Sequence, residues 1–256
     1  MQGTLFRIFM DWIYISPHLD DAVLSLGGLI WEQARTEVDV SIWTICAGNP
    51  PSSKLSSFAV SIHERWGLGS NAVEHRRGED ILACSILGAD YYHFDIPDCI
   101  YRVSPITGDF LYESENDLWS SIHPDEYDLL VELEKQLEEK FPMNANIVCP
   151  LGIGDHVDHK LTVEAVTGAF REISKGKNLK IYYYKDFPYV MEKKGKPDLG
   201  SLKSRLITIS PGGITAWQEA IAAYRSQIST FWNSLEEMET DIQNYYYQTG
   251  GIWLGV

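Results

Sequence analysis

One histidine and two aspartates lie close together near the start of this 256-residue chain, in the segment His18-Leu19-Asp20-Asp21. They offer an imidazole and a carboxylate as metal ligands, with a second carboxylate left over as a base. A structural interpretation competes with this one: Asp20 or Asp21 caps the helix that follows, and His18 makes a hydrogen bond in a turn. The short cluster alone does not separate the two interpretations.

A second cluster, His156-Val157-Asp158-His159, opens a predicted helix. Residues three apart on a helix share a face, so His156 and His159 point to the same side. One could bind a metal while the other contacts a substrate, and Asp158 could orient a neighbouring imidazole by accepting its N–H. The structural alternative is a polar first turn that Asp155 or Asp158 caps.

Together the two clusters predict hydrolytic chemistry. Two histidines and one carboxylate with an open fourth position are the ligands of a catalytic zinc, and ferrous iron or another divalent ion accepts the same set. Zinc lowers the pKa of a bound water to about 7 and so generates a nucleophile at neutral pH. A carboxylate then remains as general base and a histidine as donor to a developing oxyanion, which suits hydrolysis of an acyl bond.

Alternating strand and helix signals indicate how the clusters are positioned. The predicted strands are Trp12–Ser16, Val38–Ala47, Tyr91–Phe94, Ile147–Cys149, Lys180–Tyr184 and Leu206–Ser210. The predicted helices are Val23–Arg35, Val73–Leu87, Pro124–Lys140, Asp158–Ile173, Thr215–Gln227 and Phe231–Ile242. This alternation predicts an α/β fold with a mostly parallel sheet and helices on both faces.

Polar residues follow several of these strands directly. His18 comes after the first, the segment Asp95–Asp98 after the third, and His156 after the strand at Ile147. The carboxyl ends of parallel strands share one rim, where such sheets bind ligands. Residues 95–122 show no clear periodicity and are predicted to form a long surface excursion.

Composition narrows the function classes. The net charge of −15 makes nucleic acid and anionic membrane surfaces poor partners. No apolar run reaches the ~18 residues of a membrane span, and no secretory signal is evident, so the protein is predicted to be cytoplasmic. The four cysteines are scattered with no C-x-x-C pair, and three of them lie in apolar runs and are expected to be buried. The length suits a single domain over residues 1–256, with residues 1–9 interpreted as an extension.

Several motifs resemble those of the PIG-L/LmbE-like de-N-acetylase family. They are Pro17-His18-x-Asp20-Asp21 with Gly27-Gly28, Arg76-x-x-Glu79-x-x-x-Ala83-x-x-x-Leu87-Gly88, Pro97-Asp98, His156-x-Asp158-His159 and Ala223-Tyr224-Arg225-Ser226-Gln227. The resemblance covers about residues 12–230 and implies a Rossmann-like fold. It also implies zinc-dependent removal of an N-acetyl group from an N-acetylglucosamine-containing small molecule or glycoconjugate.

The resemblance also implies residue roles. It makes His18, Asp21 and His159 the metal ligands and Asp20 the base that activates water. His156 would stabilise the tetrahedral intermediate.

The remaining implied roles concern support and substrate binding. The resemblance places Asp158 behind the imidazole of His156, and makes Arg76 and Asp98 sugar-binding residues. Arg77 is an equally charged neighbour of Arg76.

Two departures from the family pattern leave alternatives open. Leu19 and Ala22 stand where the family usually has proline and glutamate, which leaves room for a divergent substrate. The alternatives are a metal-dependent hydrolase of another amide or ester and a catalytically inactive carbohydrate-binding domain of the same fold. The aglycone of the sugar and a homo-oligomeric state are not readable from the sequence.

Overall fold

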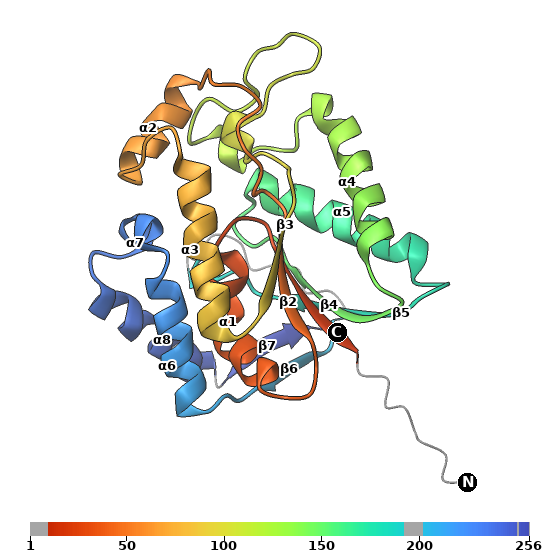
Figure 1. Cartoon of the computed structure of the whole chain (residues 1–256), viewed down its shortest axis with the longest axis vertical. Helices are drawn as coiled ribbons and strands as arrows, with labels where there is room; N and C mark the ends of the chain where they lie inside the picture. The colour runs from red at the N-terminus through yellow and green to blue at the C-terminus, as the bar shows by residue number, and fades with distance from the viewer. Residues whose placement is uncertain (1–9, 192–201, 250, 256) are drawn as a thin grey trace.

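A computed structural model describes residues 10–191, 202–249 and 251–255, and in them a seven-stranded sheet of order β3-β2-β1-β4-β5-β7-β6 (Figure 1). The strands are β1 (Asp11–Ser16), β2 (Val40–Thr44), β3 (Asp90–His93), β4 (Asn144–Pro150), β5 (Asn178–Tyr184), β6 (Ser204–Ile207) and β7 (Ile252–Gly255). β1 to β5 pair in parallel, and β7 runs antiparallel to both β5 and β6. The extension predicted for residues 1–9 lies outside the described residues.

Helices cover both faces of the sheet (Figure 1). They are α1 (Asp21–Ala34), α2 (Ser57–Arg65), α3 (Ala72–Leu87), α4 (Tyr127–Lys140), α5 (Val157–Ile173), α6 (Pro211–Ala222), α7 (Arg225–Phe231) and α8 (Leu235–Thr249). Four short 3-10 turns are η1 (Cys99–Tyr101), η2 (Asp117–Trp119), η3 (Pro124–Glu126) and η4 (Tyr189–Met191). The predicted fold class is therefore confirmed. Within the described ranges, no helix is long and apolar enough to cross a membrane.

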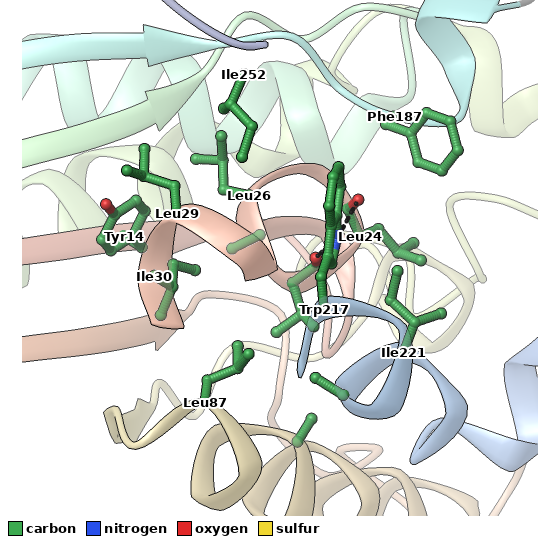
Figure 2. Packing of buried hydrophobic residues seen from close by; sticks show 14 of the residues in the cluster. Tyr14, Leu24, Leu26, Leu29, Ile30, Leu87, Phe187, Trp217, Ile221 and Ile252 are labelled. Atoms are coloured by element: carbon green, nitrogen blue, oxygen red, sulfur yellow. Dashed lines mark hydrogen bonds between the residues drawn. The ribbon is translucent and has the colours of Figure 1, made fainter. Parts of the chain in front are cut away.

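The larger hydrophobic core joins α1, α3, α6 and α8 to one face of the sheet (Figure 2). Trp217 of α6 is fully buried there, and its indole N–H donates to the carbonyl of Val23 at 2.8 Å. A Cβ on Gly27 would lie 2.5 Å from the Trp217 ring. Glycine at this position lets α1 lie close against α6, and α1 begins at the first chemical cluster.

A second core lies between α4, α5 and the opposite face of the sheet. Leu137 of α4 and Leu161 of α5 pack there against Ile15 and Ile147 from the two central strands. The side chains of β1 therefore alternate between the two cores, and this fixes where the strand ends relative to both layers of helices.

The interpretation of residues 95–122 as a surface excursion is wrong. Cys99, Ile100, Tyr101 and Tyr112 are buried in a third cluster that also includes residues of α2. Short 3-10 turns give these apolar residues no regular spacing, so a search for helix or strand periods does not detect them. Neither α2 nor β7 was predicted.

The ends of β1 and β4 create a crevice between them. These strands are neighbours, but β1 leads to β2 on one side whereas β4 leads to β5 on the other. The connections diverge, and ligands bind at such switch points in doubly wound sheets. Residues 18–21 follow β1 and residues 156–159 follow β4, so both clusters meet in the crevice.

Candidate active site

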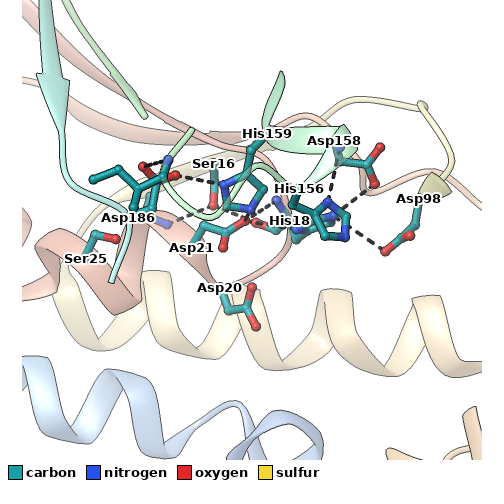
Figure 3. A network of polar contacts seen from close by, with 12 residues as sticks. Ser16, His18, Asp20, Asp21, Ser25, Asp98, His156, Asp158, His159 and Asp186 are labelled. Atoms are coloured by element: carbon teal, nitrogen blue, oxygen red, sulfur yellow. Dashed lines mark hydrogen bonds and ion pairs between the residues drawn. The ribbon is translucent and has the colours of Figure 1, made fainter. Parts of the chain in front are cut away.

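Three histidines converge where β1 ends and α5 begins (Figure 3). His18, His156 and His159 each offer a ring nitrogen within 4.8 Å of the other two. The clusters that are 140 residues apart in sequence are joined directly by a 3.0 Å contact from His18 Nε2 to Asp158 Oδ2. The hydrogen bonds of each ring differ, and they indicate which nitrogen atoms are free.

His159 is completely buried and presents Nε2 to the site. Its Nδ1 lies 2.8 Å from Asp186 Oδ1, so the proton of a neutral ring belongs on Nδ1 and the lone pair on Nε2. Nε2 makes no hydrogen bond, although Asp21 Oδ2 lies 3.3 Å away. A buried, unpaired ring nitrogen opposite a carboxylate-held N–H is typical of a metal-binding histidine.

His18 is held in a similar way from the other side. The carboxylate of Asp158 accepts from Nε2, which leaves Nδ1 facing Asp21 Oδ2 at 3.1 Å. Asp21 Oδ2 therefore lies between two ring nitrogens, 3.1 Å from His18 Nδ1 and 3.3 Å from His159 Nε2. Ligand atoms about 2.1 Å from a tetrahedral zinc are roughly 3.4 Å apart, which is close to both of these distances.

The charge of the site also favours a cation. The carboxylates of Asp21, Asp98, Asp158 and Asp186 contact the histidines, and that of Asp20 lies nearby (Figure 3). Two arginines lie next to these carboxylates. Arg76 Nη2 is 3.6 Å from Asp20 Oδ2, and Arg102 Nη1 is 2.6 Å from Asp158 Oδ1.

The same carboxylates change the titration of the histidines. Burial alone would lower the pKa of His159, but Asp21 and Asp186 outweigh it and raise the pKa to about 9. A divalent cation would interact favourably with the same carboxylates.

His156 is bonded differently from the other two histidines. It occupies the N-cap of α5, where its Nδ1 accepts a hydrogen bond from the backbone N–H of Asp158 at 3.2 Å. Neither Asp155 nor Asp158 caps this helix. Burial, reinforced by His18, lowers the pKa of His156 well below its usual value, so the ring is neutral. With Nδ1 as acceptor, the proton lies on Nε2, which makes that nitrogen a donor.

Asp20 occupies the N-cap position of α1, but its side chain makes no capping hydrogen bond. In Figure 3 it lies apart from the bonded network. The Arg76 guanidinium is 3.6 Å away, and burial together with Asp21 raises the pKa of Asp20 to about 6. The structural interpretation of Asp20 as a helix cap therefore has no support in its contacts.

Arg76 and Asp98, the expected sugar-binding residues, both line the cavity beside the histidines. Arg76 is buried under the ring of Trp66, with its guanidinium carbon 4.6 Å from the ring centroid. Arg77 instead bonds to the carbonyl of Ala47 at 2.8 Å, outside the cavity lining. Of the two neighbouring arginines, Arg76 therefore lines the cavity and Arg77 does not.

The carboxylate of Asp158 lies within 4.8 Å of a His156 ring nitrogen, but its hydrogen bond goes to His18. Its Oδ2 accepts from His18 Nε2 and from the backbone N–H of Cys99, both at 3.0 Å, while Arg102 holds Oδ1. Arg102 is also paired with the buried Glu126. These contacts turn the carboxylate towards β1. Burial alone would raise the pKa of Asp158, but the Arg102 guanidinium outweighs it and holds the pKa well below its usual value.

Sequence reasoning missed two residues that support this site. Asp186 directly follows β5, so the rule that examines strand exits would have found it if applied to that strand. Arg102 gave no such signal, because it belongs to the segment taken as a surface excursion.

Cys99, His156 and Asp158 form another group with metal-ligand spacing. Metals bind the thiolate form of cysteine. Burial raises the pKa of the Cys99 thiol well above its usual value, and Asp158 adds to the effect. The Nδ1 atom of His156 is also engaged with the backbone. This group is therefore a poorer metal site than the one around Asp21.

A cavity of about 230 Å³ opens above the histidines. The part nearest the histidines, which we call the floor, is formed by His18, Asp20, Asp21, Arg76, Asp98 and His156. The other lining residues, which we call the rim, are Ile62, Arg65, Trp66, Ile100, Glu115, Leu118, Trp119, Tyr189, Gln227, Thr230 and Phe231. Ala22, where the family motif usually has glutamate, is buried in the larger core and adds no side chain to the cavity.

Comparisons with known proteins agree with this geometry. The sequence profile of the family PIG-L, GlcNAc-PI de-N-acetylase, matches residues 13–170. The chain is 28% identical over 259 aligned residues to the 2'-N-acetylparomamine deacetylase of Niallia circulans, covering 93% of this chain and 86% of the relative.

Two solved structures extend the comparison. The zinc-inhibited form of teicoplanin deacetylase superposes with a TM-score of 0.82 at 29% identity, covering 96% of this chain and 97% of the other. The A40926 pseudoaglycone deacetylase gives a TM-score of 0.75 at 26% identity, with 96% of each chain covered. The similarity to all three proteins extends over nearly the whole of this chain.

Proposed function

The chain belongs to the PIG-L family, GlcNAc-PI de-N-acetylase, and on that premise we propose that it removes the N-acetyl group from an N-acetylglucosamine-containing small molecule or glycoconjugate. The relatives named above are deacetylases of acetylparomamine, teicoplanin and the A40926 pseudoaglycone, which supports a substrate of this kind. The observation that carries the proposal is the division of labour among the three histidines. His18 and His159 each present a ring nitrogen to Asp21, whereas His156 lines the cavity with its Nδ1 already bonded to the backbone.

A divalent ion would be held by His18 Nδ1, Asp21 Oδ2 and His159 Nε2. When bound, a zinc or ferrous ion lowers the pKa of a water molecule and polarises the acetamide carbonyl. The protein contributes the orientation of these ligands, because Asp158 holds His18 and Asp186 holds His159 through their other ring nitrogens.

Asp20 acts as the general base. It is adjacent to a ligand, lies on the cavity floor and makes no capping bond that would occupy its oxygens. A carboxylate in this position can take a proton from the attacking water and return it to the departing amine. Arg76, 3.6 Å away, keeps the Asp20 carboxylate beside the cavity.

His156 stabilises the developing oxyanion. Its Nε2–H is available because Nδ1 accepts from the backbone of α5. A neutral, pre-oriented donor of this kind stabilises negative charge that develops on the carbonyl oxygen as the acetamide is attacked. Arg76 and Asp98 would contact hydroxyl groups of the sugar from opposite sides of the floor.

Release of acetate from a panel of N-acetylglucosamine conjugates tests the proposal. Purified protein loaded separately with zinc, ferrous iron or cobalt should release one acetate for each free amine formed, and chelation should abolish it. The Asp20→Asn variant is the matched control for contaminating activity, because asparagine retains the shape of aspartate but cannot accept a proton.

The outcomes separate this proposal from its alternatives. Acetate release restricted to simple esters or to amides without a sugar would favour a hydrolase of another class. Binding of the conjugates with no acetate release under any metal would favour a carbohydrate-binding domain and would exclude the proposed activity.

A further inference from the structure

A continuous series of aromatic rings leads from the cavity mouth to His156. The ring centroids of Phe231 and Tyr189 are 6.4 Å apart, those of Tyr189 and Trp119 are 6.0 Å apart, and those of Trp119 and His156 are 5.4 Å apart. Each pair meets edge to face, with interplanar angles of 84°, 72° and 88°. The rings come from α7, η4 and η2, so separate segments build one aromatic wall.

The rim also contains apolar residues outside this series of rings. Ile62 and Trp66 lie at the end of α2, and Ile100 and Leu118 continue the surface. The Trp66 ring is fixed from below by the guanidinium of Arg76, 4.6 Å from its centroid. A ligand held at the rim would therefore contact apolar side chains from several segments, next to the polar floor.

The charged side chains of the rim neutralise each other. Arg65 of α2 forms an ion pair with Glu115, and Gln227 and Thr230 are the uncharged polar residues of the same lining. Among the rim residues, a cationic group would thus find only the carboxylate of Glu115, which is already paired with Arg65. In contrast, Trp119 leaves 42% of its surface exposed beside the cavity, which offers a flat apolar face.

We propose that the rim is a subsite for a flat aromatic group attached to the amino sugar of the substrate. The inference rests on the proposed function, since the sugar must occupy the floor for its aglycone to reach the rim. Trp119 determines the preference, because it contacts both His156 and the open cavity. The aromatic group would stack on or meet the indole edge to face, which favours planar rings over saturated ones.

Matched glycosides test this subsite. Both anomers of the methyl, phenyl, cyclohexyl and 2-aminoethyl N-acetylglucosaminides are compared by kcat/KM for acetate release. For one anomer, we expect the phenyl glycoside to exceed the methyl and 2-aminoethyl glycosides by roughly ten-fold, and the cyclohexyl glycoside to lie between them. Equal values, or a preference for the amine or the saturated ring, would overturn the inference.

Variants at Trp119 separate recognition from packing. Because Trp119 touches His156, Trp119→Ala can lower activity in general; the phenyl-to-methyl ratio within one variant cancels that loss. We expect the ratio to fall close to one in Trp119→Ala and to be largely restored in Trp119→Phe. Tyr127→Ala removes an exposed aromatic residue outside the cavity and should leave the ratio unchanged.

Failure of the proposed function would give a different result. If no glycoside releases acetate under any metal, isothermal titration with the same compounds decides the inference on binding alone. Tighter binding of the phenyl glycoside that is lost in Trp119→Ala would support the subsite even then. Equal binding of all the glycosides would overturn it.

Discussion

The floor and the rim of the cavity are built on different principles. Floor residues follow β1, β3 or β4 or belong to α3, and both His18 on the floor and His159 beside it are held by carboxylates at their other ring nitrogen. Rim residues come from α2, α7 and short 3-10 turns, and ring contacts with one exposed ion pair hold them together. Hydrogen bonds and ion pairs therefore fix the positions of the floor side chains, whereas the rim side chains are held mainly by packing, which is less directional.

This difference suggests how such a scaffold can keep its chemistry while its substrates change. A substitution on the floor leaves a buried charge or ring nitrogen without a partner, which is costly. A substitution at the rim alters the shape and the apolar area of the cavity but leaves few polar groups without a hydrogen-bond partner. Rim positions can therefore vary with much less damage to the protein.

The largest effect should come from removing a proposed metal ligand next to the floor. His159→Ala deletes the ring that Asp186 orients towards Asp21, and we expect nearly complete loss of bound metal and activity. Elemental analysis after gel filtration measures the metal. Stoichiometric zinc retained by a His18→Ala, His159→Ala double variant would show that the site lies elsewhere.

Asp20→Asn should come next. The variant keeps the shape of the side chain but cannot take a proton, so we expect kcat to fall by about 100- to 10,000-fold. Metal content should be unchanged, because Asp20 is not one of the proposed ligands. The chain should still fold, because Asp20 makes no capping bond and the contact it loses is the 3.6 Å pair with Arg76. Acetate release near the native rate would reduce Asp20 to a residue with no part in the reaction.

Replacing Arg102 tests whether the floor depends on the buried ion pairs that Arg102 makes with Asp158 and Glu126. Arg102→Gln leaves two buried carboxylates, Asp158 and Glu126, without their cation, and losing one partner of a buried pair typically costs about 3–5 kcal/mol. Urea denaturation monitored by tryptophan fluorescence measures the loss. A change below about 1 kcal/mol would mean that the floor is not held in the way these contacts indicate.

His156→Ala distinguishes a donor from a ligand. Removing one oxyanion donor usually costs about 100- to 1000-fold in turnover, with metal retained. The His159→Ala variant is its matched comparison, because both residues are buried histidines of the same α5 cluster. Should both variants lose metal equally, the assignment of the Nε2 proton to His156 is incorrect.

The smallest effect is expected at the rim. Arg65→Gln breaks the exposed pair with Glu115, and exposed ion pairs contribute about 0–1 kcal/mol to stability. The same denaturation measurement used for Arg102 provides a direct comparison of a buried and an exposed ion pair. A loss comparable to that of Arg102→Gln would contradict the distinction between floor and rim.

The sequence was informative where regular elements end. Strands β1 and β4 have clear apolar patterns, so the pattern of apolar and polar residues alone assigns the polar residues after them to one rim of the sheet. The side chains of His18, Asp21, His156 and His159 do lie together in that crevice.

The rest of the site depends on contacts that local patterns do not encode. Trp119 and Arg102 lie in the aperiodic segment of residues 95–122, whose burial follows from packing against α2. The tautomer of His156 depends on a backbone hydrogen bond at the N-cap of α5, which no spacing rule specifies. The direction of the Asp158 side chain likewise follows from Arg102.

The last two strands of the sheet have a consequence for how the chain folds. Among the described strands, β6 pairs with β7 alone, and β7 joins it to β5. β6 therefore cannot join the sheet until β7 has paired with β5. In the sequence, α6, α7 and α8 separate β6 from β7. Bringing β6 and β7 together closes this long segment into a loop, which costs conformational entropy before any strand pairing offsets it. We therefore expect β6 and β7 to form late in folding, after the five parallel strands that carry the floor.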